Sequence, residues 1–235
     1  MLLLILAFIA SLIPAFFFYR WLKKQPDMED GYAGYCRKAL IAGFVAVVPV
    51  VLGSLTLHVL GNLLHFKEQD PILYRVYWTF LVLALVEEAV KFLMMRRVIR
   101  DRACSWLEIT IFMALVGLGF EIVEAIPYAI GANPITMFVR GATLMHMTYG
   151  FVTGYFYGRA RHEKDNVYAV CGFLLVWLMH GLYDFTLSDE VLDINEAIAA
   201  VPLALAAFSV VLVFLFIRFV KKARQEDRYL EECTE

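Results

Sequence analysis

The sequence lacks most features of a soluble or nucleic-acid-binding protein. Only 19% of its 235 residues are charged, against roughly 25% in a typical soluble domain. The formal net charge of −2 gives no reason to expect nucleic acid as a partner. Internal repeats, low-complexity stretches and Gly/Ser-rich linkers are absent, so we expect a single domain over residues 1–235.

Cysteine is also scarce, with four residues in the chain. Cys36, Cys104 and Cys233 fall in segments rich in basic residues, which are predicted below to lie on the inner side of a membrane. Cys171 lies near that side as well. That side is the reducing one, so a structural disulfide is not expected. No cysteine pair has metal-ligand spacing and no H-E-x-x-H motif occurs, so the sequence does not predict a metal centre on one helix.

Apolar residues are abundant instead, at 61% of the chain with a mean hydropathy of +0.68. A helix needs roughly 20 apolar residues to cross a bilayer core of about 30 Å. The candidate stretches are 2–19, 39–61, 72–95, 106–130, 136–158, 167–187 and 197–219. Alternation with a period of two is not evident, so we predict an all-α, polytopic membrane bundle of about seven transmembrane helices.

The basic residues predict how this bundle is oriented. With the N-terminus outside and the C-terminus in the cytoplasm, 17 of the 21 lysines and arginines fall in inner segments, as the positive-inside rule requires. The acidic segment 188–196 then lies outside. The first stretch has no basic residues before it and is followed by Arg20, Lys23 and Lys24, which predicts a signal anchor rather than a cleaved signal peptide.

Ionisable residues inside these spans are costly and usually face the interior of a bundle. They are concentrated in the four central stretches, between residues 72 and 187, and are Glu87, Glu88, Lys91, Glu121, Glu124, His146, His180 and Asp184. His58, near the outer end of the second stretch, is interpreted as a structural hydrogen-bonding residue. The concentration of the others predicts a functional centre.

Helical spacing indicates which of these groups can interact. Lys91 lies three residues after Glu88 and four after Glu87, so it can pair with either carboxylate. The two glutamates are offset by about 100° around the helix, which predicts divided roles. Asp184 follows His180 by four residues and can orient its imidazole.

Depth along the helices allows these groups to meet. At 1.5 Å per residue, His146 and His180 lie about 20 Å above the inner boundary, and Glu88 lies about 12–18 Å above it. Helical side chains lean toward the N-terminus of their helix, which moves Glu88 outward. Convergence of the two histidines and the glutamates is therefore plausible on geometric grounds.

Four short motifs carry a family resemblance. They are "EEAVK" (87–91), "GFEIVEAIPY" (119–128), "HMTYGFVTGYFYG" (146–158), preceded by Arg140, and "HGLYD" (180–184). Together and in this order they resemble the PrsW family, multi-span bacterial membrane proteases that look distantly related to the CAAX prenyl endopeptidase and Abi group. The resemblance covers about residues 78–185.

The resemblance implies intramembrane hydrolysis of a peptide bond in a single-span protein such as an anti-sigma factor. The partners implied are that substrate and the lipid bilayer, and the location is the bacterial cytoplasmic membrane. Matched by motif, the catalytic candidates are Glu87, Glu88, Glu124, His146, His180 and Asp184, with Lys91 supporting them. A buried glutamate can serve as the general base and a histidine can assist the oxyanion or the leaving amine.

Alternatives stay open at this point. The same Glu, His, His and Asp set offers zinc ligands, although from three helices, so we predict metal-free chemistry and no cofactor ahead of a zinc protease. A transporter with a buried proton relay is a further alternative, but no internal repeat supports it. Gly150, Gly154 and Gly158 recur every fourth residue, which permits close approach of either a neighbouring helix or a substrate strand.

Overall fold

The part of the chain that the structure describes is helical, as predicted. The computed structural model describes residues 2–24, 31–65, 67, 70–101, 104–131, 143–188, 191 and 196–232. The helices are α1 (Leu2–Lys23), α2 (Tyr32–Leu63), α4 (Pro71–Val76), the π-helix η1 (Tyr77–Leu85), α5 (Val86–Val98), α6 (Trp106–Gly131), α8 (Met145–Glu163), α9 (Asn166–Thr186), the 3₁₀-helix η2 (Glu196–Ala199) and α11 (Ala200–Glu232).

Every predicted stretch corresponds to helical structure, with shifted ends. The stretch 72–95 is a continuous run of α4, η1 and α5 whose middle is a π-helix instead of an α-helix. The stretch predicted to begin at 136 is seen as α8 from Met145, because 132–142, with Arg140, lie outside the described residues. Cys233 and most of the acidic segment 188–196 also lie outside them.

Four helices within the described residues are long and apolar enough to cross a membrane. They are Tyr32–Leu63, Trp106–Ile126, Asn166–Thr186 and Ala200–Ala223. The protein is therefore a multi-pass membrane protein, and the figure of about seven crossings stays a prediction. In α8 and α5 the polar residues of the candidate site lower the apolar content.

Side-chain caps define where several helices begin. Asp70 Oδ1 accepts hydrogen bonds from the amides of Ile72 and Leu73 at 2.9 and 3.0 Å, so α4 begins at the following proline. Ser105 and Glu108 form a reciprocal capping box at the start of α6. These caps satisfy amides that have no partner within their own helix.

Helix α6 is the centre of the bundle. Its residues from 107 to 120 are all buried, and it packs against α2 and α8. The contact with α8 is close: a Cβ added at Gly150 would lie 2.4 Å from the carbonyl oxygen of Met113, and one at Gly117 would lie 2.0 Å from that of His146. The glycine row of α8 is therefore occupied by a neighbouring helix, α6, one of the two alternatives that the sequence left open.

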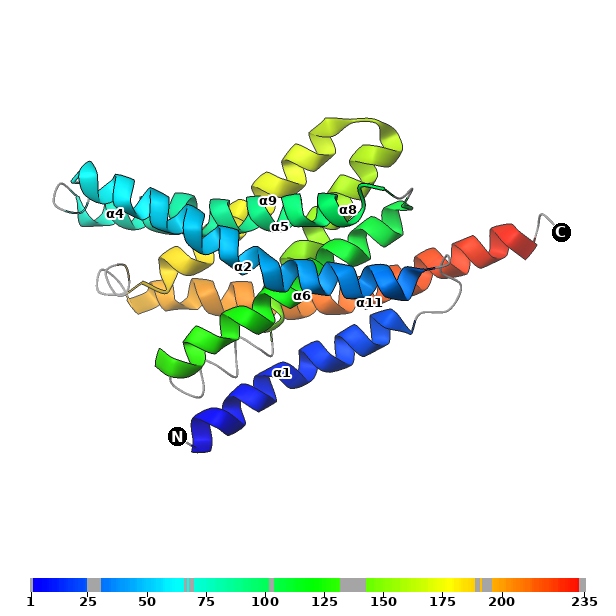
Figure 1. The fold of residues 1–235 in the computed structure, drawn as a ribbon, viewed down its shortest axis with the longest axis horizontal. Helices are drawn as coiled ribbons and strands as arrows, with labels where there is room; N and C mark the ends of the chain where they lie inside the picture. Colours follow the sequence, from blue (N-terminus) through cyan, green and yellow to red (C-terminus); the bar gives the residue numbers. More distant parts are fainter. Residues whose placement is uncertain are drawn as a thin grey trace.

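The long helices run alternately up and down the bundle. Figure 1 shows α1, α5 and α11 running in one direction and α2 running back between them. As a result, the basic helix ends lie together at one end of the molecule (Figure 1). The basic residues that they carry are Arg20 and Lys23, Arg37 and Lys38, Arg96 and Arg97, Arg159 and Arg161, and Arg218 and Lys221. The outer surface between the ends is apolar, with exposed residues such as Leu52 on α2 and Phe214 on α11, as expected for a surface in contact with lipid.

Candidate active site

The motif "EEAVK" lies in the first two turns of α5, directly after the π-helix. Glu87, Glu88 and Lys91 are all buried, with 6%, 1% and 1% of their surface exposed. Side chains from neighbouring helices hold the π-helix by its carbonyl groups: Trp177 Nε1 donates to Phe80 O at 2.6 Å and Ser54 Oγ donates to Val82 O at 2.7 Å. The segment before the glutamates is thus anchored to both α2 and α9. π-turns of this kind are frequent at functional sites.

Glu88 is held through one of its two carboxylate oxygens, while its other oxygen, Oε2, is buried and accepts no hydrogen bond from the described part of the chain. Its Oε1 atom accepts from Lys91 Nζ at 2.6 Å and lies 2.8 Å from Nδ1 of His180. The predicted pairing of Lys91 with Glu88 is present, and Lys91 is 3.8 Å from Glu87 Oε2 on its other side. Lys91 therefore serves both carboxylates but is bonded to Glu88.

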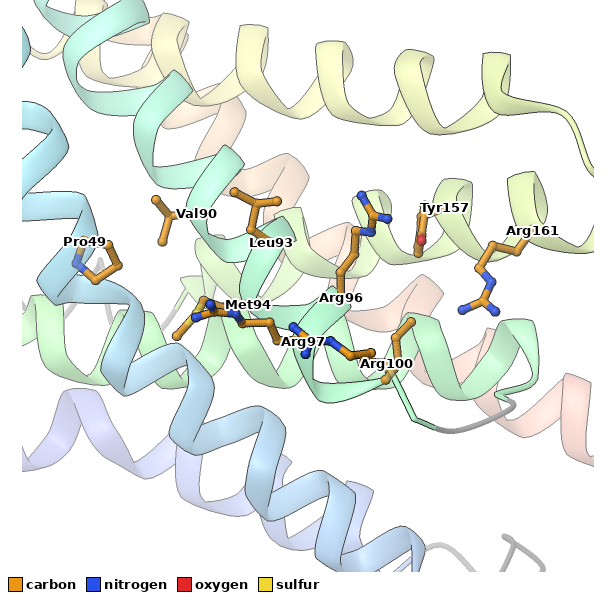
Figure 2. Close-up of a pocket in the computed structure, with 10 residues that line it drawn as sticks. Pro49, Val90, Leu93, Met94, Arg96, Arg97, Arg100, Tyr157 and Arg161 are labelled. Atoms are coloured by element: carbon orange, nitrogen blue, oxygen red, sulfur yellow. The ribbon is translucent and has the colours of Figure 1, made fainter.

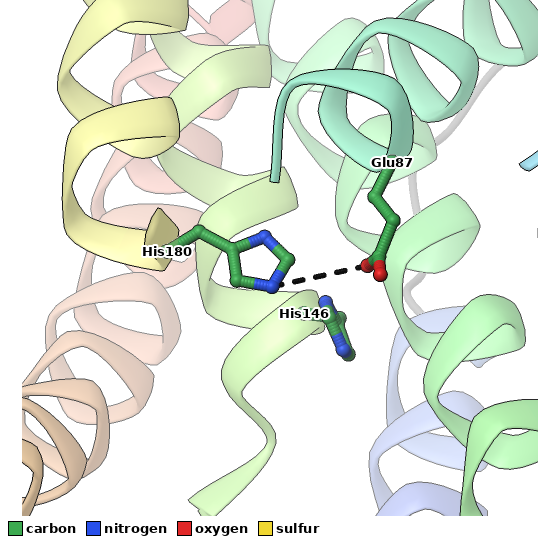
Figure 3. Close-up of side chains that lie close together, drawn as sticks. All are labelled: Glu87, His146 and His180. Atoms are coloured by element: carbon green, nitrogen blue, oxygen red, sulfur yellow. Dashed lines mark ion pairs between the residues drawn. The ribbon is translucent and has the colours of Figure 1, made fainter. Parts of the chain in front are cut away.

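Glu87 is arranged differently. Its Oε2 atom is buried and accepts no hydrogen bond from the described part of the chain. That oxygen lies 3.8 Å from both Lys91 Nζ and His180 Nε2. Figure 3 shows the Glu87 carboxylate facing the imidazoles of His146 and His180, with the dashed line joining it to His180. A buried carboxylate oxygen without a donor is where proteins hold a water molecule or a cation.

His146 enters the site from the first turn of α8. Leu144 precedes it with φ of 49° and ψ of 45°, a left-handed conformation that is strained for leucine and starts the helix abruptly. The Nε2 atom of His146 lies 2.6 Å from Glu124 Oε2, and its Nδ1 atom lies 2.9 Å from Lys91 Nζ. Since an ammonium only donates, Nδ1 is the acceptor and the Nε2–H group donates to Glu124.

His180 on α9 is surrounded by carboxylates. In addition to Glu88 at Nδ1, its Nε2 atom lies 3.4 Å from Asp184 Oδ2, the partner predicted from the spacing of four residues. The rings of His146 and His180 are 5.2 Å apart between centroids. The structure thus brings all six predicted catalytic residues and Lys91 into one connected network.

Three further residues complete this network: Glu121, which the sequence placed among the ionisable residues of the spans but not among the catalytic candidates, and Tyr149 and Phe120, which it did not single out. Glu121 Oε2 accepts from the Met147 amide at 3.4 Å, so it caps α8 beside His146. The ring of Tyr149 packs 5.6 Å from that of His180, and Phe120 packs 5.1 Å from His146 and beneath Lys91. The three-residue spacing from His146 to Tyr149 was a usable signal, because it puts both on one helix face.

His58 has the surroundings of a structural residue. Its ring nitrogens lie 3.2 Å from Asn62 Nδ2 and 3.5 Å from the Tyr74 hydroxyl, and its ring packs edge-on against Trp78. These partners belong to α2 and to the α4–η1 run, and none of them is a predicted catalytic residue. The arrangement agrees with the interpretation of His58 from the sequence.

The fold and the site together define a class of protein. It is a multi-pass membrane protein in which carboxylates, imidazoles and one ammonium are buried between the helices. Comparison with known families narrows this class. Residues 34–218 match a family model described as PrsW family intramembrane metalloprotease. The chain belongs to the PrsW family of intramembrane proteases, as its motifs predicted.

Individual relatives agree with this assignment. The protein named Protease PrsW from Shouchella clausii (strain KSM-K16) is 26% identical over 190 residues, covering 77% of this chain and 83% of the relative. Protease PrsW from Clostridioides difficile (strain 630) is 23% identical over 203 residues, covering 78% and 79%. Protease PrsW from Geobacillus kaustophilus (strain HTA426) is 30% identical over 115 residues, covering 46% and 51%. No solved structure matches the chain.

Proposed function

We propose that the protein is a glutamate-dependent intramembrane endopeptidase that hydrolyses a peptide bond in or near the bilayer. The observation that carries the proposal is the buried Oε2 atom of Glu87, which accepts no hydrogen bond within the described part of the chain and faces two imidazoles. Membership of the PrsW family supplies the reaction class. The geometry supports Glu87 as the general base, while Glu88 holds Lys91 and His180 in place.

In the proposed reaction, Glu87 removes a proton from a water molecule as the water oxygen forms a bond to the carbonyl carbon of the substrate. The carbonyl π-electrons move to oxygen, and the Nε2–H group of His180, whose contact with Asp184 Oδ2 is 3.4 Å long, stabilises the resulting oxyanion. Collapse of this intermediate breaks the C–N bond, and the proton held by Glu87 passes to the leaving amine. Glu124 and Asp184 orient the two histidines.

The proposed substrate is a single-span membrane protein such as an anti-sigma factor. A site formed by α5, α6, α8 and α9 is enclosed among apolar helices, so a substrate that reaches it travels through the bilayer. The proposed location is the bacterial cytoplasmic membrane.

A metal-dependent reaction is the second candidate, and one cluster favours it. Glu87, His146 and His180 each offer a ligand atom, and these atoms lie within 4.8 Å of one another. One carboxylate and two imidazoles form a donor set that suits zinc, and the oxygen of Glu87 that accepts no hydrogen bond from the described residues is compatible with a cation. A metal bound there would act as a Lewis acid on the carbonyl oxygen or on water.

The contacts of His146 favour the metal-free reaction. Both of its ring nitrogens are engaged, Nδ1 by Lys91 and Nε2 by Glu124, so a metal ligand role requires one of these bonds to break. The Lys91 ammonium also lies 3.8 Å from Glu87 Oε2, where it repels a divalent cation. We therefore place the metal-free reaction first.

Chelation separates the two candidates. We expect the purified protein to cleave a single-span fusion substrate equally well before and after treatment with a strong zinc chelator, and to contain far less than one zinc per chain. Cleavage is measured on gels and metal by mass spectrometry. Activity that disappears on chelation and returns with added zinc would establish the metal-dependent reaction instead. Absence of cleavage under all metal conditions, with a folded protein, would count against both.

The same proposal includes an orientation. We expect the N-terminus outside and the C-terminal tail in the cytoplasm, because the basic helix ends lie together at one end of the bundle (Figure 1). Fusions of a periplasm-active and a cytoplasm-active reporter within the segments 96–101 and 159–166 test this orientation. Periplasmic activity at either position contradicts it.

A further inference from the structure

A second polar feature lies outside the catalytic network, at the basic end of the bundle. A cavity of about 680 Å³ opens there between α2, α5 and α8, within the size range of about 300–1,000 Å³ that is usual for ligand sites. Four arginines line it: Arg96, Arg97, Arg100 and Arg161. None of them takes part in the proposed reaction.

The cavity has an apolar part and a basic part. Figure 2 shows Pro49, Val90 and Leu93 on one side and the arginines Arg96, Arg100 and Arg161 on the other. Leu93 is 55% exposed, on a surface that faces lipid if α5 crosses the membrane. The basic part lies closer to the helix ends, since Arg100 follows the last residue of α5. A ligand that fits therefore has an anionic head at the end of the bundle and an apolar tail along the helices.

The positive charge of the cavity has no acidic counterpart in the part of the chain that the structure describes. No carboxylate lines it among the described residues, and none of the four arginines is within ion-pair distance of a carboxylate in that part of the chain. Asp101 lines, with Arg97 and Lys38, a separate cavity of about 260 Å³. Guanidinium groups are weakly hydrated and bind phosphate oxygens in a bidentate manner, so this cluster is suited to a phosphate group of net negative charge.

We propose that this cavity binds the headgroup of an anionic phospholipid, with an acyl chain lying along Val90, Leu93 and Met94. Basic pockets between transmembrane helices are a known type of lipid-headgroup site. A lipid is favoured over a free phosphate because one side of the cavity is apolar and exposed. The inference goes beyond the proposed protease activity and does not depend on it.

The test compares two variants that remove the same charge. In the first, Arg96, Arg100 and Arg161 are replaced by glutamine; in the control, Arg37, Arg218 and Lys221 are replaced by glutamine. All six side chains are exposed and all lie at the basic end of the bundle, but only the first three line the cavity. Thermal unfolding in detergent verifies that both variants are folded.

Binding is measured by native mass spectrometry and by titration of the detergent-solubilised full chain with phosphatidylglycerol or phosphatidylcholine. We expect the wild type and the control variant to bind phosphatidylglycerol at least tenfold more tightly than phosphatidylcholine. Each arginine near a headgroup contributes about fivefold in affinity, so the cavity variant should lose about a hundredfold. Excess inorganic phosphate should not displace the lipid.

Three results would overturn the proposal. Equal binding of the two lipids by the wild type would show that the cavity does not select charge. An equal loss in the control variant would assign the effect to general surface charge. Displacement of the lipid by inorganic phosphate, or by a soluble acidic peptide at comparable concentration, would assign the cavity to a free phosphate or to an acidic protein segment.

Discussion

Replacing Glu87 with glutamine is expected to reduce the rate of peptide-bond cleavage by about 10²–10⁴-fold, the usual contribution of a general base. Glutamine preserves the shape of the side chain but cannot remove a proton from water. Because Glu87 Oε2 accepts no hydrogen bond in the described part of the chain, the substitution breaks no hydrogen bond there. Protein level and thermal stability should therefore remain close to those of the wild type. The measurement is cleavage of a fusion substrate by equal amounts of purified protein.

Two further variants make this result interpretable. Glu88→Gln removes the charge that pairs with Lys91 and His180, so it should lower the stability of the protein as well as its activity. His58→Ala changes a hydrogen-bond network outside the site and should cleave at close to the wild-type rate. If Glu87→Gln accumulates normally and cleaves at the wild-type rate, Glu87 is not the base and the proposed reaction is wrong.

Replacing Lys91 with methionine is expected to lower the free energy of unfolding by about 3–5 kcal/mol, the usual cost of leaving one member of a buried ion pair without its partner. Lys91 is 1% exposed and its ammonium contacts Glu88 and His146, so both would lose a donor. Thermal unfolding of the detergent-solubilised protein, together with its yield from membranes, measures the effect.

The double variant Lys91→Met/Glu88→Gln separates a charge effect from a packing effect. Removing both charges leaves no carboxylate at position 88 without its ammonium, so the double variant should recover most of the stability lost in Lys91→Met. It should not recover activity, because His180 loses its charged partner at Nδ1. A Lys91→Met protein as stable as the wild type would show that the ion pair has no structural role.

The sequence predicted those parts of the site that depend on local spacing. Lys91 with its two glutamates, and His180 with Asp184, are three or four residues apart on single helices, and each contact is present. The apolar runs likewise predicted the helices, because a chain in lipid must satisfy its backbone hydrogen bonds internally. Family motifs then indicated which polar residues belong together.

Contacts between helices were not predictable in the same way. The pairing of His146 with Glu124, and of Lys91 with His146, depends on how α5, α6 and α8 are placed in three dimensions. The π-helix before Glu87 has no signature in hydropathy, because Thr79 is the only polar residue of the segment Tyr77–Leu85 and no apolar face stands out. The arginine cavity also joins residues from α5 and α8 that appeared in the sequence only as orientation signals.

The close glycine contacts between α6 and α8 determine which part of the protein is able to move. The backbones of α6 and α8 touch at Gly117 and Gly150 and cannot slide or separate without large rearrangement. These two helices therefore form a rigid pair next to His146. A substrate segment needs a passage to Glu87, and we expect that passage to open on the opposite side, between the run from α4 to α5 and helix α9. There the two sides meet at Phe80 and Trp177, so opening the passage has to break the hydrogen bond from Trp177 Nε1 to Phe80 O but requires no change in the backbones of α6 and α8.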